Sequence, residues 1–181
     1  MCIEVLIADL AVEHAARTVR EHTDALGLHI DLLVNNAGFA TAGRFEQLDP
    51  VTDHAQVMLN VVTVVDLAHQ YLPAMADRGH GAVINVASIG GFQPAPYLAV
   101  YSASKAFVLT FSQALWGEYR SRGIQVLALC PGPVDTGFFD IPAVARLPSA
   151  NECPSTRWSV RRSSPCAPVT ATPCPAGATA S

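Results

Sequence analysis

The sequence predicts an α/β domain built around a parallel sheet. Short apolar runs alternate with longer segments in which apolar residues recur at helical spacing. Strands that alternate with helices of this length are typical of βαβ units, which place the strands parallel to one another. Only 14% of the residues are charged, against roughly 25% in ordinary soluble domains. That composition fits strands buried on both faces by helices.

The predicted elements follow one another along the chain. Strand signals lie at residues 3–8, 32–35, 82–87 and 125–130, and helical patterns lie at residues 12–25, 50–77 and 101–122. The second helix should begin at Pro50, because Asp49 is a capping residue and proline suits the first helical position. Its apolar residues occur nearly all round, so we expect it to be covered on more than one side.

The composition changes abruptly near Pro148, which divides the chain into a domain at residues 1–147 and a tail at residues 148–181. The tail is rich in Pro, Ser, Ala, Thr and Arg, and its prolines exclude a long helix. We expect it to be disordered, because such a composition buries too little apolar surface to offset chain entropy. A shifted reading frame and a natural tail would both explain the change.

Composition and patterning exclude several classes of function. The net charge of −4 offers no basic field to a nucleic acid, and every apolar stretch is interrupted well before the roughly 18 residues of a transmembrane helix. The first residues lack the basic region of a signal peptide. The five cysteines form no Cys-x-x-Cys pair, and the six histidines form no metal pattern. We therefore expect a cytoplasmic protein with reduced thiols and without a metal, membrane or nucleic-acid partner.

Three side chains at fixed spacing indicate proton-transfer chemistry. Tyr101 and Lys105 are four residues apart, so in a helix they share one face. An ammonium beside a phenol lowers the tyrosine pKa, and such a tyrosine can exchange a proton with a carbonyl or hydroxyl oxygen near neutral pH. Ser88 ends the apolar run 82–87, where its hydroxyl could reach the same oxygen. Taken alone, a Tyr-x-x-x-Lys pair is more often an exposed lysine beside a half-buried ring.

Further motifs resemble those of the short-chain dehydrogenase/reductase family. The segment Asn35-Asn36-Ala37-Gly38 follows one apolar run, Asn60 lies in a helical pattern, and Pro131-Gly132-Pro133-Val134 follows another apolar run. With Ser88, Tyr101 and Lys105 they show the family's order and spacing over about residues 3–140. The resemblance implies a Rossmann-like, doubly wound parallel sheet. It also implies an oxidoreductase that interconverts a carbonyl and an alcohol by hydride transfer with NADP or NAD. Each motif read separately is an ordinary turn or helix residue.

The resemblance also implies a role for each reacting residue. Tyr101 would be the general acid/base, and Lys105 would lower its pKa and bind the nicotinamide ribose. Ser88 would polarise and orient the carbonyl. Asn60 would hold, through a local backbone irregularity, the water that links Lys105 to solvent.

The cofactor would be held by residues from several loops. Asp9 and Leu10 would meet the adenine, Asn35, Ala37 and Gly38 the adenine ribose, Tyr101 and Lys105 the nicotinamide ribose, and Pro131, Gly132, Val134 and Thr136 the carboxamide side. Read alone, Asp9 is a strand-end cap. The sequence does not distinguish NAD from NADP, since the discriminating segment of the family is absent. The apolar loop 90–97 indicates a hydrophobic carbonyl or alcohol as substrate, and the helices 50–77 and 101–122 would form a homo-oligomer.

One motif of the family is absent. The family begins with a Thr-Gly-x-x-x-Gly-x-Gly turn that receives the cofactor pyrophosphate, and this sequence contains no such turn. The resemblance implies that the run 3–8 is the family's third strand, and that the first two strands and the last one are missing. The run must then pair with residues 32–35 or stay unpaired, which leaves an apolar edge open to aggregation. The alternative to an active oxidoreductase is an inactive fragment or a non-enzymatic module that associates with intact relatives.

Overall fold

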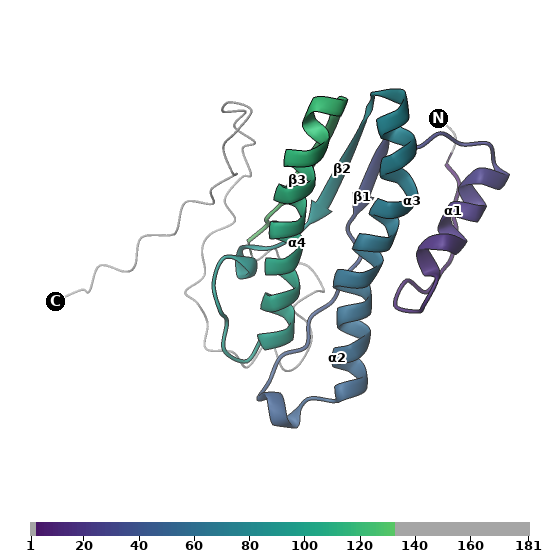
Figure 1. Ribbon diagram of the computed structural model, residues 1–181. Helices are drawn as coiled ribbons and strands as arrows, with labels where there is room; N and C mark the ends of the chain where they lie inside the picture. The colour runs from purple at the N-terminus through teal and green to yellow at the C-terminus, as the bar shows by residue number, and fades with distance from the viewer. Residues whose placement is uncertain (1–2, 133–181) are drawn as a thin grey trace.

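The computed structural model describes residues 3–132, and the expected parallel sheet is present within them (Figure 1). Its strands are β1 (Leu32–Asn35), β2 (Gly81–Val86) and β3 (Ile124–Leu129), arranged in that order. Both neighbouring pairs are parallel, and each pair is joined through helices. The prediction of consecutive βαβ units is therefore confirmed, with strand bounds within about one residue of those expected.

The helices lie where the apolar periodicity predicts them. They are α1 (Ala15–Ala25), α2 (Pro50–Val57), α3 (Thr63–Arg78) and α4 (Ala99–Tyr119), with short 3₁₀ turns at Phe45–Gln47, Ile89–Gly91 and Arg120–Arg122. Figure 1 shows α3 and α4 side by side across one face of the sheet. α1 packs against α3, and α4 packs against β3. The helices thus form one layer over the strands.

The expected single helix at 50–77 starts as predicted but is interrupted. The Asp49 carboxylate accepts hydrogen bonds from the backbone N–H groups of Val51 and Thr52, and Pro50 occupies the first turn. A π turn at Met58–Val62 then separates α2 from α3. Because a π turn inserts an extra residue into the helical ladder, it re-aims the side chains that follow it. The irregularity lies at Asn60, where the family resemblance places one.

The core lies between the sheet and the helical layer. Met75 of α3, Val83 of β2, and Ile124 and Val126 of β3 are among its buried members. Along the strands these residues alternate with others that point to the opposite face, as the period of two requires. The helices therefore cover one face of the sheet with a continuous apolar layer.

The second face of the sheet is not covered by the described residues. Val34, Ile84 and Leu127 lie in register across the three strands, and Val34 and Leu127 are 50% and 42% exposed. The expectation that helices bury both faces thus holds for one face within residues 3–132. The apolar character of both faces is nevertheless what parallel strands require.

The prediction of a strand at residues 3–8 is wrong. The segment has no strand ladder, and Ile3, Val5 and Ile7 are exposed, Ile7 by 94%. β1 pairs with β2 only among the strands of residues 3–132. Of the two outcomes expected for this run, the unpaired one is observed. An apolar run becomes a strand only when a neighbour accepts its backbone hydrogen bonds.

Some predictions can be compared only with the described residues, and others lie beyond them. Within residues 3–132, no helix is long and apolar enough to cross a membrane, and no group of three or more His, Cys, Asp or Glu side chains is arranged to hold a metal ion. The predicted boundary between domain and tail at residues 147/148 lies outside the described residues, as do Val134 and Thr136.

Candidate functional site

The three residues predicted to move a proton converge at the carboxyl end of β2. Ser88 follows that strand by two residues, and Tyr101 and Lys105 lie on consecutive turns of α4. The Ser88 and Tyr101 side chains are hydrogen-bonded. The Lys105 Nζ lies 5.9 Å from the centre of the Tyr101 ring. The sequence spacing therefore corresponds to a spatial cluster.

The Lys105 side chain is fixed by a hydrogen bond to β2. Its side chain is buried, and its Nζ donates to the Val86 carbonyl oxygen at 2.7 Å. Burial lowers the pKa of Lys105 to about 8, although the nearby Cys130 acts in the opposite direction. The ammonium is thus bound to the last residue of β2, the strand that Ser88 follows.

The expected lowering of the Tyr101 pKa is not observed. Burial raises the pKa of Tyr101, and the hydrogen bond from Ser88 offsets only part of that rise. Desolvation disfavours the phenolate, and the Lys105 ammonium donates a hydrogen bond to the Val86 carbonyl. A lowered tyrosine pKa would need a positive charge whose effect outweighs this desolvation.

Asn60 ties the loop after β1 to α4. Its side chain is 1% exposed, and its Oδ1 accepts from the Phe39 N–H at 3.2 Å. Its Nδ2 donates to the Phe39 carbonyl at 2.9 Å and to the Ser104 hydroxyl at 3.2 Å. The side chain therefore mimics a strand partner for Phe39. Ser104 is the residue before Lys105, so the same amide fixes both walls of the site.

The Asn-Asn-Ala-Gly turn lies against Lys105. A Cβ on Gly38 would approach the Asn60 Oδ1 to 2.8 Å and the Lys105 Nζ to 3.5 Å. Glycine is required at this position because any side chain would collide with the Asn60 amide. The first residue of the turn, Asn35, donates to Asn85 Oδ1 at 2.8 Å, and Asn85 in turn donates to Ser112 Oγ at 2.9 Å. This buried chain of hydrogen bonds fastens β1 and β2 to α4.

The other predicted cofactor contacts are placed less centrally. The Asp9 carboxylate is exposed and accepts from the Ala11 N–H at 2.8 Å, as a local cap does. The Leu10 carbonyl accepts from the Thr63 hydroxyl at 2.6 Å, which joins this turn to the start of α3. The Pro131 carbonyl accepts from the Ile89 N–H at 3.1 Å. Pro131 and Gly132 thus lie beside the segment that follows Ser88.

A stripe of polar side chains on α2 completes the site and was not predicted. The Thr41 N–H donates to Gln56 Oε1, and the Thr41 hydroxyl donates to Asp53 Oδ1 at 2.6 Å. Together with Asn60, these two residues hold residues 39–41 along one face of the helix. The available signal was a polar residue recurring at helical spacing in an otherwise apolar helix. Gln56 is fully buried, so its amide serves the fold rather than solvent.

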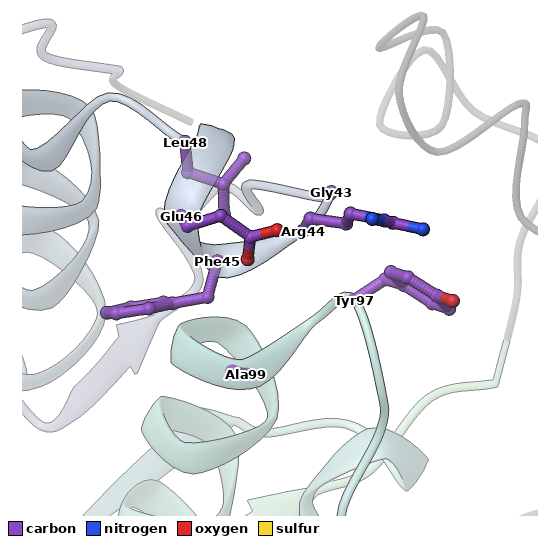
Figure 2. A pocket seen from close by; sticks show the side chains of 7 residues that line it. All are labelled: Gly43, Arg44, Phe45, Glu46, Leu48, Tyr97 and Ala99. Atoms are coloured by element: carbon purple, nitrogen blue, oxygen red, sulfur yellow. The ribbon is translucent and has the colours of Figure 1, made fainter.

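A cavity of about 350 Å³ lies beside the start of α4. Its lining comes from two segments, one after the Asn-Asn-Ala-Gly turn and one before Tyr101: Gly43, Arg44, Phe45, Glu46, Leu48, Tyr97 and Ala99. Figure 2 shows the Arg44 and Tyr97 side chains extending in the same direction, while Phe45 points the opposite way. The Gly43 N–H donates to the Tyr97 carbonyl at 2.8 Å and so joins the two walls.

Comparisons with known proteins agree with this arrangement. A family model described as short chain dehydrogenase matches residues 2–141. The chain is 34% identical over 137 residues to the 17-beta-hydroxysteroid dehydrogenase type 3 of Mus musculus, covering 75% of this chain and 44% of that protein. It is 37% identical over 128 residues to the very-long-chain 3-oxoacyl-CoA reductase of Homo sapiens, covering 67% and 41%.

A solved structure shows the same fold. The short-chain dehydrogenase from Sphingobium yanoikuyae, in complex with NADPH, is 33% identical, with a TM-score of 0.74 over 82% of this chain and 58% of that one. The chain spans less than half the length of the mouse dehydrogenase and of the human reductase. The matched part contains the Asn-Asn-Ala-Gly turn, the Ser88–Tyr101–Lys105 cluster and the strands that position them.

Proposed function

We propose that this chain, which belongs to the short-chain dehydrogenase family, is an NAD(P)-dependent oxidoreductase that interconverts a carbonyl and an alcohol. The observation that supports this most directly is the hydrogen bond between Ser88 and Tyr101, at the end of a parallel strand and next to Lys105. Ligands of open parallel sheets bind at the carboxyl ends of the strands, which is where this cluster lies.

Each side chain of the cluster has a definite task in this proposal. The Tyr101 hydroxyl donates its proton to the carbonyl oxygen during reduction and recovers it during oxidation. The Ser88 hydroxyl donates a hydrogen bond to the same oxygen, orients it and stabilises the charge that develops there. Asn60 fixes the position of the loop and of α4 between which the substrate enters. Lys105 supplies the positive charge that favours proton release from Tyr101 once the site is filled.

Two features of the turn after β1 support a dinucleotide as cofactor. The backbone at Gly38 lies so close to Asn60 Oδ1 and Lys105 Nζ that a Cβ would not fit, and the buried Asn35 Oδ1 has no hydrogen-bond partner among residues 3–132. In the proposal, Asn35, Ala37 and Gly38 bind the adenine ribose, Tyr101 and Lys105 the nicotinamide ribose, Asp9 and Leu10 the adenine, and Pro131, Gly132, Val134 and Thr136 the carboxamide side. A nicotinamide cofactor supplies the hydride, while this chain supplies the placement and the proton.

Other parts of the proposal concern partners and location. The substrate is an apolar carbonyl compound or alcohol, as the loop at residues 90–97 indicates. α2, α3 and α4 associate with a second copy, and the protein is cytoplasmic. The competing proposal is an inactive relative or an interaction module.

The test compares two tyrosines of the same helix. The full chain is incubated with NADPH or NADH, deuterated at the transferred position, and a panel of ketones and aldehydes, and deuterated alcohol is measured by mass spectrometry. Tyr101→Phe should reduce the rate by about 10²- to 10⁴-fold, the usual contribution of general acid catalysis. Tyr119→Phe is the control, since Tyr119 packs on the core side of α4. No deuterated product, or equal rates for wild type and Tyr101→Phe, would favour the competing proposal.

A further inference from the structure

The cavity beside α4 is connected to the reacting cluster through the segment that joins Ser88 to Tyr101. Tyr97 and Ala99 line the cavity and belong to that segment. Gly90 belongs to it as well, and a Cβ there would lie 3.4 Å from Ser88 Oγ and 3.7 Å from Tyr101 Cε1. Ala99 is the first residue of α4 and lies two residues before Tyr101, so the cavity borders the helical turn that carries the reacting tyrosine.

Tyr97 shows that this wall is held against a local conformational cost. Its φ is +67°, a left-handed value that is rare for a residue with a bulky side chain. The hydrogen bond from Gly43 to the Tyr97 carbonyl keeps this conformation, and the ring remains 48% exposed. Strained residues that present an exposed side chain into a cavity cluster at ligand-binding sites. The strain is thus a second observation, independent of the cavity, that points to a ligand.

The chemistry of the lining is apolar with one available cation. Phe45, Leu48 and Tyr97 offer apolar and aromatic surface. Between residues 3 and 132, no hydrogen bond or ion pair involves the Arg44 guanidinium, whereas Arg17, Arg20 and Arg78 each make at least one ion pair. In Figure 2 the Arg44 side chain extends in the same direction as the Tyr97 ring and its hydroxyl, with the guanidinium away from the Glu46 carboxylate. A guanidinium and a phenol hydroxyl together are suited to a carboxylate or a phosphate.

We infer that this cavity binds the part of the substrate remote from the reacting carbonyl, and that Arg44 selects substrates carrying an anionic group on an apolar body. The inference rests on the proposed function and names its substrate class: a keto acid or a keto phosphate, or the corresponding hydroxy compound. Phe45, Leu48 and Tyr97 contact the apolar body, and the carboxylate or phosphate lies against Arg44. Glu46 opposes a second negative charge at the other end of the cavity.

The test measures binding, so it does not depend on turnover. The full chain is titrated with 9-oxodecanoate, with its neutral methyl ester and with 8-oxononyl phosphate, and shifts in the amide spectrum are followed by NMR. The wild type should bind one or both anions at least about tenfold more tightly than the ester, as expected for a charge-assisted hydrogen bond. Arg44→Gln should remove that preference, and Glu46→Gln should retain or increase it. Arg17→Gln is the matched control, because Arg17 is an exposed arginine on α1 outside the cavity.

The two anions distinguish the source of the charge. Tighter binding of the carboxylate assigns keto acids as the substrate class, and tighter binding of the phosphate assigns keto phosphates. Equal affinity for both means that the site accepts either anion. The inference is overturned if the ester binds as tightly as the anions, if Arg44→Gln leaves the ratio unchanged, or if no probe binds. Failure of the proposed function looks different, because it would abolish Tyr101-dependent turnover and leave the Arg44-dependent binding preference intact.

Discussion

The buried lysine provides a quantitative test of the site that needs no cofactor. Burial lowers the pKa of Lys105 from 10.5 to about 8, a change of 2.5 units by subtraction. At roughly 1.4 kcal/mol for each unit, the folded state disfavours the charged lysine by about 3–4 kcal/mol. Between pH 8 and 10.5 the unfolded chain binds more protons than the folded one, so stability should rise with pH through that window. Below pH 8 both states are protonated and the full cost remains.

The substitution Lys105→Met should remove this rise. At pH 7 it relieves the burial of a charge but also removes the hydrogen bond to the Val86 carbonyl, which is worth about 1–3 kcal/mol. The two effects oppose each other, so the pH dependence is more informative than stability at one pH. We expect the free energy of unfolding of the wild type to rise by about 1 kcal/mol from pH 7.5 to 9, relative to Lys105→Met. Urea unfolding followed by circular dichroism measures this difference.

A second titrating group must be separated from the first. Burial also raises the pKa of the Cys130 thiol, against a smaller opposing effect of a backbone hydrogen bond from Ser88 and of the Lys105 charge. A raised thiol pKa makes the folded state less stable as the pH increases above 9, which is the opposite sign. Cys130→Ala should therefore steepen the rise above pH 9 and leave it unchanged below. The window from pH 7.5 to 9 reports mainly on Lys105.

The lysine can also be observed directly. Lys105 is the only lysine of the chain, so protein labelled with ¹³Cε-lysine gives a single lysine resonance. Its chemical shift should titrate near pH 8. A midpoint near 10.5, together with parallel stability curves for the wild type and Lys105→Met, would refute the burial argument and the site geometry on which it depends.

Two glycine substitutions test the remaining geometry, each against a glycine that lies in open space. Gly38→Ala should displace the Asn60 amide, because the new Cβ would approach it to 2.8 Å, and should therefore weaken NADPH binding measured by calorimetry. Gly117→Ala in α4 is the control and should be neutral or stabilise the fold by about 1 kcal/mol. Equal NADPH affinity for the wild type and Gly38→Ala would contradict the close approach. Gly123→Ala should lower the thermal unfolding temperature more than Gly79→Ala does. Both glycines have positive φ, but only a Cβ at Gly123 would collide with a backbone oxygen, at 2.1 Å. Equal losses of stability would mean that the positive φ alone sets the cost of each substitution.

The elements that could be predicted are those whose signal is local. β1, β2, β3 and the three helical segments follow from apolar runs and helical periodicity, and the start of α2 follows from Asp49 and Pro50. The division of the second segment into α2 and α3 does not follow from periodicity. The run 3–8 has the same local signal as the true strands. It fails as a strand because pairing depends on a neighbour, which its own residues cannot specify. The open sheet face at Val34 and Leu127 has the same origin.

The sequence predicted which residues form the site but not the pKa values of their side chains. The spacing of Ser88, Tyr101 and Lys105 indicated that they meet, and they do. The direction of the Tyr101 pKa was wrong, because the spacing does not reveal that Lys105 would be directed to the Val86 carbonyl or how deeply the phenol is buried. Burial is a property of the whole packed layer and cannot be read from a four-residue interval.

The polar residues inside the apolar helices link the fold to the proposed chemistry. Asn60 bonds both polar groups of the Phe39 backbone and the Ser104 hydroxyl, and Asn85 bridges Asn35 to Ser112. Each amide thereby connects the segment at β1 to α4, the helix that carries Tyr101 and Lys105. An apolar side chain of similar size could fill either space but could not specify one relative position of strand, loop and helix. Because breaking these buried hydrogen bonds is costly, the networks favour the arrangement in which the reacting side chains meet.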